Sequence, residues 1–270
     1  MQTVTSTVCG AAHSPDEYQQ IEDWLKQRMY ASVGALFFLA QSCDPKSGWQ
    51  LIRQYHVNQP KQLSSVAVLR YGGTCFWVMS ENTIIPEILN SIIAAQPRRI
   101  MTSGQGREQL ELVEYPLTLM TRSYDQWVMI CQQTSIQGDA SLATVDDIEQ
   151  LQHYQRCYNT ERNVNEISDW QEMIAQQKVW VSRRYGQIVA VLKLGMQTDQ
   201  IVTFGGTYTF PEYRQQGYAK RLVAFAVNCI LQQKKIAYLI VDQDNIAAIQ
   251  LYQKIGFKIV STAYVGYLHD

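Results

Sequence analysis

The sequence predicts a mixed α/β fold, with a mixed central sheet flanked by helices, in two tandem domains. The chain has 270 residues, more than the roughly 150 that one domain usually needs. Helical and strand-type patterns alternate in both halves. A polar stretch without periodicity lies near the midpoint and is typical of a linker. We therefore expect one domain over residues 1–132, a linker over 133–141 and a second domain over 142–270.

Local signals place the elements of the first half. Ser14 followed by Pro15 and by Glu17 predicts the start of a helix, because serine caps, proline fits the first turn and an acid stabilises it. Two β-type runs around Gly72 and Gly73 predict a hairpin. The other expected elements are a short buried segment of uncertain type at 35–40, helices at 86–95 and 104–110, and strands at 99–102, 116–120 and 126–131.

The second half repeats this kind of pattern. Thr144 with Asp147 three residues later predicts another capped helix start. Strand-type runs on either side of Tyr185 and Gly186 predict a second hairpin, and Gly256 predicts a helix end. The other expected elements are helices at 148–154, 170–174, 217–233 and 245–255, and strands at 201–208, 236–241 and 257–268. Ancient duplication and two unrelated α/β domains both explain the similar order.

Composition argues against several classes of protein. Lys plus Arg is 23 and Asp plus Glu is 24, so the net charge is −1 and no nucleic-acid partner is expected. No apolar run approaches the 18 or so residues of a membrane span, and the N-terminus lacks a secretory pattern. The six cysteines and four histidines are scattered, so no metal site is expected. We expect reduced thiols and a cytoplasmic protein that binds no membrane.

A loop at residues 214–219 carries the first chemical signal. It lies between a predicted strand and a long amphipathic helix, where unpaired backbone N–H groups and the helix dipole favour a phosphate. Gly217 and Ala219 are small enough for a ligand to approach the backbone. Lys220 and Arg221 add positive charge, which a bound polyanion would offset. An ordinary strand-to-helix turn with a glycine is the alternative.

The second signal is the pair Asn245 and Tyr252. They are seven residues apart and share one face of the predicted helix. Each residue has an ordinary alternative, since asparagine is a common helix N-cap, for which Asp244 competes, and tyrosine is often half buried. The pair therefore indicates a site only together with the loop.

Taken together, the two signals resemble the GCN5-related N-acetyltransferase (GNAT) superfamily. That family has an Arg/Gln-x-x-Gly-x-Gly/Ala loop after its fourth strand and, later, an Asn-x-x-Ala-x-x-x-Tyr-x-x-x-Gly-Phe signature. The matching residues are Arg214–Ala219 for the loop and Asn245, Ala248, Tyr252, Gly256 and Phe257 for the signature. The resemblance covers residues 142–268 and implies the acyl-CoA N-acyltransferase fold. Residues 1–132 lack both motifs and resemble the degenerate N-terminal domain of two-domain members; the nearest loop there, Ser103–Arg107, is a plain glycine turn.

The resemblance also implies a cofactor and a set of site residues. Acetyl-CoA would be the co-substrate, bound by Thr207, Tyr208, Thr209, Arg214, Gln215, Gln216, Gly217, Tyr218, Ala219, Lys220 and Asn245. The backbone around Thr207 would pair with the pantetheine arm, and the loop amides would hold the pyrophosphate. Tyr252 would be the general acid that protonates the departing thiolate. A phenol of pKa about 10 is a suitable donor to a thiolate of pKa about 8.5.

The acceptor and the general base are less defined by the sequence. The strand at 201–208 contains no acid, and Glu212, Asp242 and Asp244 are weak candidates for a base. A small-molecule amine is the preferred acceptor, with a protein amine as the alternative. A non-catalytic acyl-CoA sensor and a transferase that uses charged tRNA are further alternatives. The first domain would shape the acceptor cleft or mediate association, and both monomer and homodimer remain open.

Overall fold

The computed structural model describes residues 6–12, 14–56, 59–80, 83, 85–112 and 120–268. The chain forms two compact units. Unit 1 contains Met1–Val128, Ile240–Asp244 and Val260–Asp270, and unit 2 contains Met129–Leu239 and Asn245–Ile259. Unit 1 thus takes two segments from the C-terminal part of the sequence. The domain boundaries expected at residues 132 and 142 remain a prediction.

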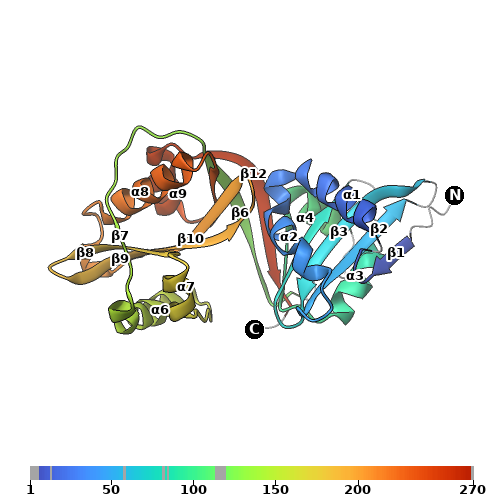
Figure 1. Cartoon of the computed structure of the whole chain (residues 1–270), viewed down its shortest axis with the longest axis horizontal. Coiled ribbons are helices and arrows are strands. Elements are labelled where there is room, and N and C mark those ends of the chain that lie inside the picture. Colours follow the sequence, from blue (N-terminus) through green and yellow to red (C-terminus); the bar gives the residue numbers. More distant parts are fainter. Residues whose placement is uncertain are drawn as a thin grey trace. The chain divides into compact units, whose positions relative to one another are not determined.

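Unit 1 is a mixed sheet with helices on both faces (Figure 1). Its strands follow the order β1-β2-β3-β4-β5-β12, in which only β4 and β5 pair in parallel. The elements are β1 (Ser6–Cys9), α1 (Pro15–Lys26), α2 (Met29–Ser42), β2 (Trp49–His56), β3 (Gln59–Arg70), β4 (Thr74–Met79), α3 (Ile85–Ala94), β5 (Arg99–Ser103), α4 (Gly104–Glu111), β6 (Arg122–Cys131), whose last three residues fall in unit 2, and β12 (Lys258–Tyr267), whose first two residues fall in unit 2.

The expected starts and turns of unit 1 are confirmed. The Ser14 hydroxyl accepts the Glu17 N–H at 3.2 Å, as a helix cap should, and β3 and β4 form the hairpin around Gly72 and Gly73. The segment of uncertain type at 35–40 belongs to α2, whose apolar residues cover most of its circumference. Such a helix lacks a polar face, so its sequence shows no helical pattern of apolar and polar residues from which a helix could be predicted. The strand expected at 116–120 falls almost wholly outside the described residues.

Unit 2 repeats the same order of elements. Its strands follow the order β7-β8-β9-β10-β11, and only β10 and β11 pair in parallel. The elements are β7 (Ser141–Leu142), the short 3₁₀ helix η1 (Val145–Asp147), α6 (Ile148–Arg162), α7 (Trp170–Ala175), β8 (Val179–Arg184), β9 (Gln187–Gln197), β10 (Ile201–Thr209), the 3₁₀ helix η2 (Pro211–Tyr213), α8 (Tyr218–Gln232), β11 (Ile236–Asp242), whose last three residues fall in unit 1, and α9 (Ile246–Ile255).

The helices of unit 2 cover opposite faces of its sheet (Figure 1). Leu151, Tyr154 and Trp170 of α6 and α7 pack against Val181 and Val191 on one face. Helices α8 and α9 lie on the other face. Since the sheet is covered on both sides, a ligand can reach its strands only at an edge, at a turn or where two strands separate.

Residues 133–140 of the predicted linker have no regular secondary structure, Ser141 already belongs to β7, and the segment is anchored within unit 2. The Thr134 hydroxyl donates to the Ile255 carbonyl oxygen at 2.6 Å, and Asn228 Nδ2 donates to the Ile136 carbonyl oxygen at 3.0 Å. Gly138 packs directly on the backbone of α8, where a larger residue would not fit. No helix in the described part of the chain is long and apolar enough to cross a membrane.

Candidate functional site

The centre of the candidate site is a stretch of β10 with an unpaired side. Toward β9, Gly205 pairs with Lys193 and Tyr208 with Val191, so Gly206 and Thr207 form a bulge opposite one residue. Toward β11, the pairing involves only Ile201–Thr203 and Ile236–Tyr238. Beyond Thr203, β10 therefore presents backbone N–H and C=O groups that no described strand uses on that side. An extended ligand can add to such an edge as an extra strand.

The bulge is held in place from α6. The Tyr154 hydroxyl donates to the Gly206 carbonyl oxygen at 2.6 Å, and Tyr154 is completely buried. Gly206 has a φ of +59°, a value that favours glycine. A Cβ atom there would lie 2.5 Å from Lys193 Cε and 2.7 Å from the Tyr154 hydroxyl oxygen. Both the backbone conformation and the packing therefore require glycine.

Replacing Gly206 by alanine is expected to lower the free energy of unfolding by about 1–3 kcal/mol, because overpacking and a positive φ both oppose the methyl group. Gly205→Ala is the matched control, since a Cβ atom at Gly205 meets no atom within 4 Å. That control should change stability by less than about 0.5 kcal/mol. Urea denaturation of the two variants measures the difference. Equal stability of the two variants would show that the bulge adapts.

Beside the bulge, a lysine is fixed in an aromatic cage. Lys193 Nζ lies 2.8 Å from Glu166 Oε2 and between 5.7 and 5.9 Å from the ring centroids of Tyr154, Tyr158 and Trp170. Both the carboxylate and the ring faces attract the ammonium group and hold it in place. Glu166 is therefore engaged and is not a free general base.

Tyr252 points from α9 into the apolar side of this region. Its side chain is 8 % exposed and its ring packs against Phe204 and Phe257. Burial raises the pKa of Tyr252 above its usual value, while the Thr207 side chain and the positive charge of Arg162 lower it. The net shift is upward, so the phenol keeps its proton throughout the neutral pH range. Arg162 ends α6, and no sequence signal connected it with Tyr252.

Two threonine hydroxyls of β10 lack partners. Thr207 Oγ1 and Thr209 Oγ1 are inaccessible to solvent and no described residue completes a hydrogen bond with either. The Thr207 side chain is close enough to Tyr252 to influence the phenol, but the two hydroxyls do not reach hydrogen-bond geometry. A buried hydroxyl without a hydrogen-bond partner lowers the stability of the folded protein. A ligand bound along β10 would provide such partners to both threonines.

The loop before α8 presents a row of free backbone donors. Gln215 and Gly217 have φ values of +60° and +81°, and Arg221 N–H is the first to bond within the helix, to the Gly217 carbonyl oxygen at 3.1 Å. Among the described residues, no acceptor is used by the N–H groups of residues 215–220. The first turn of α8 contains no acidic residue, and Lys220 has no carboxylate partner there. This concentration of donors and positive charge suits a polyanion.

The side chains of two predicted ligand residues are already used within the protein. Arg214 Nη2 lies 2.6 Å from Glu161 Oε2, and Arg214 Nε donates to the Thr209 carbonyl oxygen at 3.0 Å. The Tyr208 ring is buried against α6, next to Tyr154 and Phe210. Only the backbone of these two residues is thus placed for a ligand.

Asn245 is partly committed to its own helix. Its Oδ1 accepts the Ala248 N–H at 3.3 Å, which makes it the N-cap of α9. The Nδ2 group has no partner among the described residues and is available to a ligand. The alternative interpretation of Asn245 as a cap is therefore confirmed, and its role toward the cofactor stays a prediction.

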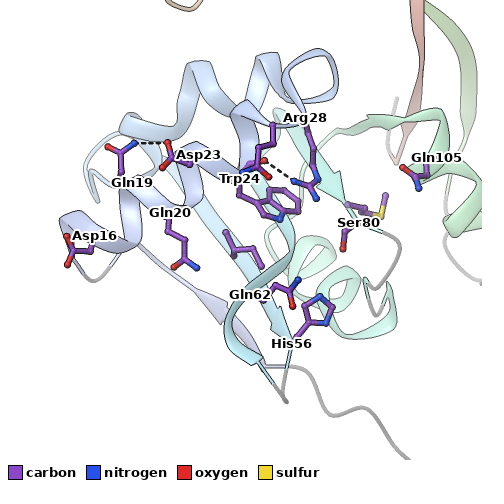
Figure 2. A pocket seen from close by; sticks show the side chains of 13 residues that line it. Asp16, Gln19, Gln20, Asp23, Trp24, Arg28, His56, Gln62, Ser80 and Gln105 are labelled. Carbon is purple, nitrogen blue, oxygen red and sulfur yellow. Dashed lines mark hydrogen bonds between the residues drawn. The ribbon is translucent and has the colours of Figure 1, made fainter.

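A separate polar pocket of about 860 Å³ lies in unit 1 (Figure 2) and contains none of the predicted site residues. It is lined by Asp16, Gln19, Gln20, Asp23, Trp24, Gln27, Arg28, His56, Gln62, Leu63, Met79, Ser80 and Gln105. Its charged groups are partly used within the wall, because Gln19 donates to Asp23 at 2.9 Å and Arg28 stacks on the Trp24 ring at 3.9 Å. The wall shows no nucleophile paired with a base.

A family model and several solved structures match this chain. Residues 145–257 match the model of the Acetyltransferase (GNAT) family. No curated protein matches the sequence. A Drosophila protein has a TM-score of 0.64 at 11% identity, over 98% of both chains. A GCN5-related N-acetyltransferase from Sphaerobacter thermophilus has a TM-score of 0.62 at 13% identity, over 98% of this chain and 96% of its own.

A third structure, a fungal β-N-acetylglucosaminidase, contains a region described as a GCN5-related glucosamine N-acetyltransferase. It has a TM-score of 0.58 at 10% identity, over 98% of this chain and 38% of its own. At these identities the structures establish the fold alone. Because the likeness extends over nearly the whole chain, the acyl-CoA N-acyltransferase fold and its two-part arrangement are confirmed.

Residues 145–257, which hold the loop and the tyrosine helix described above, therefore resemble the Acetyltransferase (GNAT) family. Members of this family transfer acyl groups from acyl-CoA. The unpaired stretch of β10 and the free donors before α8 are compatible with that co-substrate.

Proposed function

We propose that the protein is an acetyl-CoA-dependent N-acetyltransferase that moves the acetyl group directly to an amine. One arrangement carries the proposal: the unpaired edge of β10 leads to the free N–H groups at the start of α8, and a protonated tyrosine, Tyr252, lies next to that edge. An extended pantetheine arm and a pyrophosphate need these two kinds of surface in this order.

In this proposal the chain binds acetyl-CoA mainly through its backbone. The pantetheine amides pair with the free N–H and C=O groups of β10 around Thr207 and Thr209. The pyrophosphate accepts hydrogen bonds from the N–H groups of residues 215–220, with Lys220 adding charge. Asn245 contributes its Nδ2 group. Arg214 acts by tying the loop to Glu161 and to the end of β10.

The chemical step forms one bond and breaks another. The neutral amine nitrogen attacks the thioester carbonyl carbon, the carbon–sulfur bond breaks, and Tyr252 gives its proton to the thiolate, while the proton that the acylated nitrogen loses returns to the Tyr252 phenolate through water. The amine must first lose a proton. The nearby Glu161 and Glu166 are both held in ion pairs, so the proton is expected to leave to water. The rate should then rise with pH up to the pKa of the acceptor amine.

We infer that the acceptor is a small-molecule amine. The near-zero net charge supports this choice, because no acidic surface for a basic protein tail is indicated. The fungal neighbour that acetylates glucosamine makes amino sugars a sensible first group to test. We also propose a cytoplasmic location, since all six cysteines are free thiols.

Thermal denaturation with and without acetyl-CoA tests the cofactor part of the proposal. At about 100 times the Kd, binding to the folded state should add about 2.7 kcal/mol to the free energy of unfolding and raise the Tm by a few degrees. CoA alone should give a comparable shift. Thiol release during incubation with a panel of amines, glucosamine included, then identifies the acceptor. Absence of any shift at millimolar acetyl-CoA would contradict the proposal, and a shift without turnover of any amine would favour a sensor.

A further inference from the structure

The tip of the β8–β9 hairpin presents two side chains beside the predicted pyrophosphate loop. Arg184 ends β8, and Tyr185 and Gly186 form the two-residue turn, with φ values of +50° and +81°. A tyrosine with positive φ is unusual, because asparagine or glycine is favoured at this turn position. The Tyr185 side chain is 93 % exposed. Neither burial nor turn geometry therefore explains a large aromatic residue here.

Arg184 is oriented between this tyrosine and the loop. Its Cζ lies 5.4 Å from the Tyr185 ring centroid, and its Nη1 lies 3.5 Å from Gln216 Oε1. Gln216 Nε2 donates to the Glu212 carbonyl oxygen at 3.0 Å, which keeps the amide oxygen toward Arg184. Within the described ranges, Arg184 pairs with no carboxylate.

The neighbouring arginines are already used. Arg183 binds Asp147 through two hydrogen bonds of 2.9 and 2.6 Å, and Arg221 lies 3.1 Å from Asp139. The ion pair with Arg183 offsets the desolvation of the buried Asp147 carboxylate. The hydrogen bonds from Arg183 lower the pKa of that carboxyl. Unlike these two neighbours, Arg184 has no carboxylate partner in the described part of the chain, so its charge is available to a ligand.

We propose that Arg184 and Tyr185 bind the 3′-phosphoadenosine end of the CoA co-substrate, with the guanidinium on the 3′-phosphate and the phenol ring stacked on the adenine. This inference rests on the proposed function. In CoA the 3′-phosphate is one ribose away from the pyrophosphate. Gln216 belongs to the predicted pyrophosphate loop. The Arg184 guanidinium lies next to Gln216 and can therefore reach the 3′-phosphate. Arginine matches phosphate geometry, and exposed aromatic rings stack on bases.

The inference predicts selection of acetyl-CoA over 3′-dephospho-acetyl-CoA through Arg184. In isothermal titration, the wild-type protein should bind acetyl-CoA about 10- to 100-fold more tightly than 3′-dephospho-acetyl-CoA. This is the factor expected for one charge-assisted contact. Arg184→Gln should lose most of this preference and leave the affinity for the dephospho compound unchanged. Arg156→Gln, at an exposed arginine of α6, is the matched control and should retain the preference.

Tyr185→Asn tests the stacking partner, because asparagine suits the turn and removes the ring. This variant should bind acetyl-CoA and its dephospho form more weakly by a similar factor. It should keep the preference for the ligand with the 3′-phosphate. An undiminished preference in Arg184→Gln would overturn the assignment of the phosphate, and unchanged affinities in Tyr185→Asn would overturn that of the adenine. If the wild-type protein binds neither nucleotide, the proposed function fails together with this inference.

Discussion

Replacing Tyr252 by phenylalanine is expected to lower kcat by about 100-fold or more while leaving the Kd for acetyl-CoA nearly unchanged. The substitution removes the proton donor to the thiolate, and positioned acids contribute about 10²- to 10⁴-fold. It removes little packing, because the ring contacts with Phe204 and Phe257 remain. Steady-state kinetics with a thiol reagent gives kcat, and titration gives the Kd.

Tyr238→Phe is the matched control for the loss of a buried hydroxyl. Tyr238 is 4 % exposed and lies on β11 of the same unit, and burial raises its pKa as well. This variant should keep kcat within a few-fold of wild type. The raised pKa of Tyr252 further predicts that the wild-type rate does not fall through ionisation of this phenol until the pH exceeds the usual tyrosine value of about 10. Full activity of Tyr252→Phe would remove the tyrosine from the mechanism.

The elements that the sequence predicted have local signals. Capped starts such as Ser14 and Thr144, and glycine turns such as Gly72–Gly73, fix a helix end or a hairpin without reference to the rest of the chain. Helix α2 and strand β2 were not predicted as such. Helix α2 is apolar on most sides, and the buried part of β2 contains Arg53 and Gln54, which break the apolar alternation. The buried Arg53 charge is paired with Glu17 of α1 at 2.7 Å, a contact between distant positions that no local pattern indicates.

The candidate site divides in the same way. The loop at 214–219 and the pair Asn245 and Tyr252 are contiguous motifs and were readable in the sequence. The residues that support them are not. Tyr154 reaches Gly206 across 52 positions, and Arg184 reaches Gln216 across 32. Such contacts depend on how α6 and the β8–β9 hairpin pack on β10, which periodicity does not specify.

The two units share an order of elements but differ at the turn that would hold a phosphate. By that order, the counterpart of the loop before α8 is the turn between β4 and α3, not the Ser103–Arg107 turn singled out in the sequence. The Ser80 N–H there already donates to the Ser64 carbonyl oxygen at 2.9 Å, and Thr83 N–H donates to Ser80 at 3.1 Å. This turn also lacks glycine. The role of unit 1 remains a prediction.

Replacing Gly217 by valine is expected to raise the Kd for acetyl-CoA by at least about 100-fold. Gly217 has a φ of +81°, and a Cβ atom would lie 3.3 Å from Arg221 Nη1. For a β-branched residue this backbone conformation is less favourable by roughly 1–2 kcal/mol. The turn is therefore expected to shift and to misalign the free N–H groups. Each lost hydrogen bond to a charged phosphate costs about 1.5–3 kcal/mol, and two such losses account for the factor.

Gly72→Val separates this effect from backbone strain. Gly72 also has a positive φ, +61°, and a Cβ atom there meets no atom within 4 Å. Both variants should therefore lose a similar free energy of unfolding in urea, whereas only Gly217→Val should lose affinity for acetyl-CoA. If both bind acetyl-CoA as the wild type does, the loop before α8 does not hold the pyrophosphate. If both lose affinity in proportion to their lost stability, the effect of Gly217 on binding is indirect, and the free N–H groups of residues 215–220 must serve another purpose.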